Sequence, residues 1–153
     1  MKLNARLTAM VMIAACGGAA KGPEAAGGAA AGSNRSLYDR LGGRDAIALV
    51  VKDFIEQRVA KDDRINAYFM NTDIPAFEAL LVDQICEATG GPCTYRGKDM
   101  KTAHVGMKIR DADFTATVED LKASLDQFKI GAKDQQELLG ALAPMHDEIV
   151  TAK

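Results

Sequence analysis

Apolar residues recur every three or four positions along most of the chain after residue 36, which is the period of a helix with one buried face. The first such stripe lies between Asp45 and Asp62. Its apolar members are Ile47, Val50, Val51, Phe54, Ile55 and Val59. No segment of the sequence shows the two-residue alternation that is typical of a strand. The pattern therefore predicts an all-α fold.

Capping and turn residues indicate where the helices of the first half begin and end. Ser36 is a candidate N-cap for a short first turn, which Gly42-Gly43 ends. Asp73 is a candidate cap for another long helix, with Pro75 in its first turn. The stripe of that helix consists of Phe77, Leu80, Leu81, Gln84 and Ile85. The sequence Gly90-Gly91-Pro92 is expected to end it.

Three more helices are expected in the second half. A short one spans about residues 99–105, Asp111 or Asp113 caps a longer one, and the last follows a break at Gly131. The apolar face of the longer helix consists of Phe114, Val118, Leu121, Leu125 and Phe128. The last helix carries Leu138, Leu139, Leu142, Met145 and Ile149.

The chain begins with the pattern of a secretory signal in residues 1–15. Lys2 and Arg6 supply a basic start, which an apolar run closed by small side chains follows. This run is too short for a permanent membrane span, which needs about 20 apolar residues. Cys16 comes directly after Ile13-Ala14-Ala15, and this stretch resembles a bacterial lipobox. An ordinary signal peptide with a chance cysteine is the alternative.

Lipidation of Cys16 would anchor the protein to a membrane that it does not span. Gly17, rather than an aspartate, follows this cysteine, which implies sorting to the outer membrane of a Gram-negative cell. We therefore expect an exported protein at the periplasmic face. Residues 16–35 are rich in glycine and alanine and have no large apolar side chain, which predicts a flexible tether before a folded domain at 36–153.

Charge and cysteine content narrow the class of protein further. Without the signal, 17 basic and 21 acidic residues leave a net charge of −4, so the domain lacks the basic stripe of nucleic-acid binders. Cys86 and Cys93 are the cysteines that remain in the domain. In an oxidising compartment this spacing favours a structural disulfide over two free thiols. Six residues separate the pair, and the spacing fits neither a Cys-x-x-Cys-His haem attachment nor a zinc site.

A series of short stretches across residues 36–150 resembles the group I truncated haemoglobins, which are shortened globins. The stretches are Ser36-Leu37-Tyr38-Asp39-Arg40-Leu41-Gly42-Gly43, Val50-Val51-Lys52-Asp53-Phe54, Ala67-Tyr68-Phe69, Asn71-Thr72-Asp73, Gly90-Gly91-Pro92, Tyr95-Arg96-Gly97-Lys98-Asp99-Met100 and His104-Val105-Gly106. Each stretch alone is weak evidence of a relationship, and the resemblance rests on the order of the stretches and on the separations between them. It implies a two-over-two helical sandwich around haem b.

The resemblance assigns the proximal side of the haem. His104 matches the histidine that binds iron through one ring nitrogen, while its other nitrogen is expected to bond a backbone carbonyl. The residues that match haem-contacting or neighbouring positions are Phe69, Tyr95, Met100, Ile109 and Phe114. His146, the second histidine, matches no ligand position and is expected at the surface or partly packed.

The distal side departs from the best-known members of the family. These members place a tyrosine and a glutamine that donate hydrogen bonds to the gas ligand, and this chain has Ile55 and Leu81 at the matching positions. Phe77 occupies the gate position, and Leu80 occupies the neighbouring site that supplies a sixth histidine ligand in some relatives. The helix that carries Ile55 is one residue longer than in the family, so Glu56 competes for the inward position. Ile55 is the better choice, because a buried unpaired glutamate is costly.

Gln84 is the one polar group of the distal helix that could still reach a ligand, one turn after Leu81. A partly exposed helix residue is the equally weighted alternative. Poor stabilisation of charge on the ligand predicts faster oxygen loss or autoxidation than in the tyrosine-bearing relatives.

Three classes of function follow from these residues. The first is a haem protein that binds oxygen, nitric oxide or carbon monoxide, with nitric oxide dioxygenase activity as an enzymatic version that needs an external electron donor. The second is electron transfer or redox and gas sensing through the haem. The third is a helical lipoprotein that has lost haem and serves as an interaction module.

Overall fold

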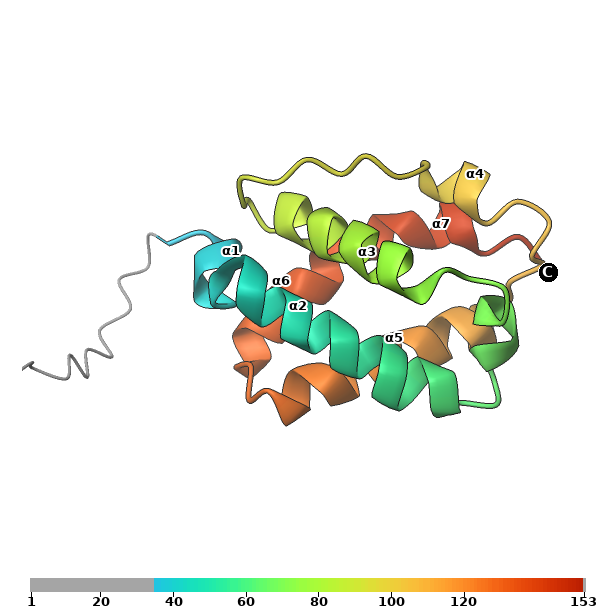
Figure 1. Ribbon diagram of the computed structural model, residues 1–153, viewed down its shortest axis with the longest axis horizontal. Coiled ribbons are helices and arrows are strands. Elements are labelled where there is room, and N and C mark those ends of the chain that lie inside the picture. Colours follow the sequence, from blue (N-terminus) through green and yellow to red (C-terminus); the bar gives the residue numbers. More distant parts are fainter. Residues whose placement is uncertain (1–34, 153) are drawn as a thin grey trace, which may run out of the picture. The chain divides into compact units, whose positions relative to one another are not determined.

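The computed structural model describes residues 35–152, which are helical and contain no strand (Figure 1). The expected signal, the Cys16 lipidation site and most of the tether therefore lie outside the described residues. The helices are α1 (Leu37–Arg40), α2 (Gly43–Asp53), α3 (Ile74–Ala88), α4 (Met100–Ala103), α5 (Asp111–Gln127), α6 (Ala132–Leu142) and α7 (His146–Ile149). Short 3-10 turns cover Val59–Lys61, Asn66–Phe69 and Ala143–Met145. None of these described helices is long and apolar enough to cross a membrane.

The core forms where α2 packs along α3 and where the residues after α2 pack on α5. The stripe predicted between Asp45 and Asp62 is buried throughout. It meets Val82 and Ile85 of α3, Leu121 and Leu125 of α5, and Leu138 of α6. Figure 1 shows α2 and α3 lying side by side, while α4 lies beside α7, away from α2.

Two of the predicted caps are confirmed by their hydrogen bonds. The Ser36 hydroxyl accepts the backbone N–H of Asp39, and the Asp73 carboxylate accepts the backbone N–H of Ala76. Each bond satisfies one of the amides that a helix start leaves without a partner. Gly42 adopts the left-handed conformation (φ 94°) between α1 and α2, which a side chain would strain.

A π-helical turn lies in the helix that was expected to hold an extra residue. Phe54–Arg58 continue α2 with the wider i to i+5 spacing, so one turn holds one more residue than an α-helix allows. Ile55 is 2% exposed, whereas Glu56 is exposed. Ile55, rather than Glu56, is therefore the residue of this turn that enters the core.

Three expected boundaries are wrong. The N-cap of α5 is Arg110, because the carboxylate of Asp113 turns back to accept the Arg110 backbone N–H. The helix predicted over 99–105 is only the single turn of α4, capped by Asp99. The last helix is divided into α6, a 3-10 turn and α7, because Pro144 cannot donate to the helix that precedes it.

The stripe predicted for α3 is only partly covered by protein. Ile85 is buried, but Phe77, Leu81 and Gln84 are half-buried and Leu80 is 36% exposed. The face of α3 that packs most closely on α2 includes Val82 and Cys86 instead. The helix thus has a covered face and a second apolar face that the described protein leaves open.

Candidate functional site

His104 lies directly after the single turn of α4. Asp99 caps this turn by accepting the backbone N–H of Thr102 at 2.8 Å. The Nδ1 atom of His104 is 2.7 Å from the backbone oxygen of Met100, one turn earlier. A carbonyl oxygen only accepts, so Nδ1 is the donor, and in the neutral ring Nε2 then carries the lone pair. No residue between 35 and 152 forms a hydrogen bond with Nε2. A histidine that binds a metal through Nε2 has this tautomer.

Large apolar side chains that match the expected contacts of the haem are incompletely covered by protein. Phe69 and Phe77 pack at 5.6 Å between ring centroids and join the edge of the core together with Leu81. Phe114 is also half-buried. Val105, next to His104, is 75% exposed. An apolar face of this kind is typical of a site for a flat apolar ligand.

The distal candidates provide no hydrogen-bond donor of their own. Ile55 belongs to the buried core, and Phe77 and Leu81 lie at its edge. Gln84 is the polar exception, but its Nε2 atom donates to the sulfurs of Met100 and Met145 at 3.4 Å each. The structure therefore places the Gln84 side chain, which extends from α3, against α4 and the turn that precedes α7.

Tyr95 and Ile109 have local structural roles. The Tyr95 hydroxyl donates to the backbone oxygen of Lys98 at 2.8 Å, and burial raises the pKa of this phenol. Ile109 is buried, and its backbone oxygen accepts the N–H groups of Thr151 and Ala152. The two residues shape the segments on either side of α4, and no hydrogen bond joins the Tyr95 hydroxyl to His104 in the described residues.

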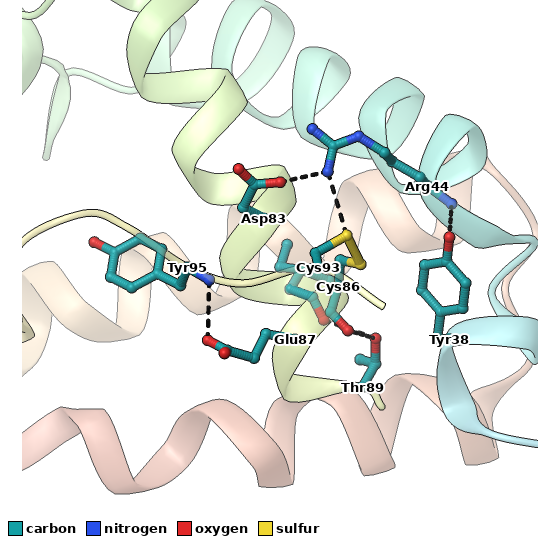
Figure 2. Close-up of a disulfide and its surroundings, with 9 residues drawn as sticks. Tyr38, Arg44, Asp83, Cys86, Glu87, Thr89, Cys93 and Tyr95 are labelled. Atoms are coloured by element: carbon teal, nitrogen blue, oxygen red, sulfur yellow. Dashed lines mark hydrogen bonds and ion pairs between the residues drawn. A yellow bond between two sulfur atoms is a disulfide. The ribbon is translucent and has the colours of Figure 1, made fainter. Parts of the chain in front are cut away.

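Cys86 and Cys93 form a disulfide that fixes the start of the segment between α3 and α4 (Figure 2). Cys86 is fully buried, while the Arg44 guanidinium lies 3.3 Å from the Cys93 sulfur and also pairs with Asp83. A side chain at Gly91 would lie 2.6 Å from the Cys86 sulfur, so glycine is required there. Closure of such a short loop stabilises the fold by about 2–3 kcal/mol.

The sequence did not reveal a polar cluster around the buried Asp113, next to the turn that carries Phe69. The Tyr68 hydroxyl donates to Asp113 at 2.9 Å, and the Arg110 guanidinium donates to both oxygens of the same carboxylate. These bonds hold the pKa of Asp113 well below its usual range, and the bond from the Arg110 side chain has the largest effect. The cluster joins the turn that carries Phe69 to the start of α5. Its only signal in the sequence was Asp113, which was interpreted as a cap.

Comparison with known families decides the class of protein. The bacterial-like globin family matches residues 36–151, which is most of the chain. The chain belongs to this family. The group 1 truncated hemoglobin of Mycolicibacterium paratuberculosis is 33% identical over 118 residues, with 77% of this chain and 86% of the relative covered. That of Tetrahymena thermophila is 35% identical over 100 residues, covering 65% of this chain and 80% of the relative.

Solved structures agree with the globin assignment. The truncated hemoglobin of Tetrahymena pyriformis in its Fe(III) form superposes with a TM-score of 0.72 at 28% identity, covering 78% of this chain and all of that one. The 2/2 hemoglobin of Synechococcus sp. PCC 7002, in the cyanomet state and with covalently attached heme, gives 0.71 at 27% identity, covering 76% and 98%. The expected two-over-two helical fold is therefore confirmed.

The cofactor of this globin is haem b, as the family and its solved members indicate. The residues of this chain fit that group. His104 presents a bare Nε2, and half-buried apolar side chains from α3, α5 and the 66–69 turn are available for a porphyrin face. Globins of this family bind diatomic gases such as oxygen.

Proposed function

We propose that this globin binds oxygen, nitric oxide and carbon monoxide at a haem iron held by His104. The observation that carries the proposal is the 2.7 Å contact between His104 Nδ1 and the Met100 backbone oxygen. This contact fixes the ring and leaves Nε2 as the ring nitrogen that can bind a metal. The haem would supply an iron whose remaining coordination position takes the gas.

The residues around the gas would be apolar. Phe69, Phe77 and Leu81 supply contacts that exclude water, and Ile55 replaces the donor of the best-known relatives. Without a hydrogen bond to the ligand, charge that develops on oxygen is poorly stabilised. We therefore expect carbon monoxide, which develops little charge, to be held well, and oxygen to dissociate or oxidise the iron quickly.

A carbon monoxide titration tests this proposal. In the reduced holoprotein, we expect a five-coordinate absorption spectrum that carbon monoxide converts directly to a six-coordinate one. A six-coordinate spectrum that carbon monoxide does not change would contradict ligand binding, and would instead favour electron transfer at a closed haem. Oxygen dissociation as slow as in tyrosine-bearing relatives would contradict the apolar distal side.

We also propose that Cys16 anchors the globin to a membrane by lipid. The support is the lipobox-like sequence at the end of the apolar run. Expressed in a Gram-negative host, the protein is expected in the detergent-soluble membrane fraction, and Cys16→Ser is expected to release it without changing its haem spectrum. Equal membrane recovery of both forms would contradict lipid anchoring at this residue.

A further inference from the structure

Gln84 joins α3 to α4, the turn that precedes His104, and to the 3-10 turn that precedes α7. Its side chain is half-buried on α3, and its Nε2 atom lies 3.4 Å from the sulfur of Met100 and 3.4 Å from that of Met145. Met100 is the first residue of α4, and Met145 ends the 3-10 turn before α7. No other pair of sulfur atoms is bridged by one polar group in the described part of the chain.

The carboxamide nitrogen of Gln84 has no hydrogen left for a gas ligand in this arrangement. A carboxamide nitrogen carries two hydrogens, and two sulfur acceptors use both. N–H donation to a thioether is weak, yet it orients the whole group. The geometry thus separates Gln84 from the distal role that its position on α3 suggested.

Met100 connects Gln84 to the proposed iron ligand. Its sulfur accepts from Gln84, while its backbone oxygen holds His104 Nδ1 at 2.7 Å. The α4 helix is a single turn of four residues, which has almost no stability of its own. Contacts with other elements must therefore fix the position of the Met100 carbonyl.

We infer that Gln84 is a positioning residue for His104, which acts through Met100. The bond from Gln84 restrains the Met100 side chain and with it the turn whose carbonyl orients the imidazole. Met145 holds the carboxamide from the other side. This inference rests on the proposed function, since it requires His104 to be the iron ligand.

Resonance Raman spectroscopy of the reduced holoprotein tests the inference through the iron–histidine stretching band. Gln84→Met keeps the length and removes the N–H donors, whereas Met100→Leu removes the acceptor and keeps the backbone carbonyl. Each is expected to shift and broaden the band and to speed haem dissociation about twofold, because both lose the bond to the Met100 sulfur and a bond to a thioether lies at the weak end of hydrogen-bond contributions. The double variant is expected to show no more than either change alone. Met145→Leu, the matched control, leaves one sulfur acceptor and is expected to have a smaller effect.

Two results distinguish the possible failures. An unchanged iron–histidine band in Gln84→Met, together with a changed vibration of the bound carbon monoxide, would overturn the inference, because Gln84 would then face the gas. Absence of an iron–histidine band from the wild-type protein would overturn the proposed function instead. Unfolding curves of all variants, recorded by circular dichroism, show whether a spectral change reflects a folded protein.

Discussion

The two histidines have different hydrogen-bond partners. His104 donates from Nδ1 to a carbonyl and leaves Nε2 bare. His146 faces carboxylate oxygens on both sides, with Nδ1 2.9 Å from Asp147 and Nε2 2.9 Å from Asp111. Carboxylates only accept, so both nitrogens of His146 must carry protons. Its ring also packs edge-on against Phe114, at 4.9 Å between centroids.

This arrangement predicts a pH dependence for the packing of α7. Asp147 and then Asp111 raise the pKa of His146 above the ordinary value of about 6.5. A histidine whose pKa is raised by folding stabilises the folded state, and this stabilisation is complete at pH values below the pKa of that histidine in the unfolded chain. The stabilisation is lost as the pH rises through the pKa of the same histidine in the folded protein. We therefore expect the thermal midpoint of the wild type to fall from pH 6 to pH 8 by more than that of His146→Gln.

Proton magnetic resonance of the His146 ring checks the cause. Asp147→Asn and Asp111→Asn are each expected to lower the His146 pKa, and Asp134→Asn, which changes a carboxylate that pairs with Arg40, is the control. A His146 pKa at or below 6.5 in the wild type would contradict the ion pairs.

At the scale of elements, the π turn after α2 is the feature with the clearest consequence. It holds one more residue than an α turn, and the exposed Glu56 lies within it. Removal of that residue would let the turn close as an α-helix and keep Ile55 and Val59 on the buried face.

Deletion of Glu56 is therefore expected to leave a folded protein, with a loss of no more than about 1 kcal/mol in urea unfolding, comparable to one surface contact. Deletion of Lys122, an exposed residue within the regular helix α5, is the matched control. It would rotate Leu125 away from the core and should prevent folding. Equal damage from both deletions would show that the π turn does not accommodate the extra residue.

Element boundaries were predictable where local chemistry sets them. Ser36 and Asp73 cap helices because their own side chains reach amides three residues later, which the sequence displays directly. At the start of α5, Asp113 bonds Arg110, three residues before it, and also Tyr68, which is 45 residues away in the sequence. No local pattern contains the contact with Tyr68.

At the scale of the whole molecule, the apolar stripes were sufficient to predict an all-α fold, and the family resemblance supplied its two-over-two arrangement. His104 was identifiable because its neighbours follow a family pattern in order. The bridge from Gln84 to Met100 and Met145 could not be identified from the sequence. Met100 and Met145 lie 16 and 61 positions after Gln84, and weak contacts with sulfur leave no periodic signal in the sequence. The open face of α3 likewise follows from a fold built around a cofactor, which helical periodicity alone does not distinguish from a core.

The central claim is that His104 holds the haem iron, and the absorption spectrum of purified variants tests it most directly. Wild type and the matched variant His146→Ala are expected to show the same Soret band and the same shift with carbon monoxide. His104→Gly is expected to lose that spectrum, and added imidazole is expected to restore it by replacing the missing ligand. A His104→Gly protein that retains the wild-type spectrum without imidazole would contradict the account.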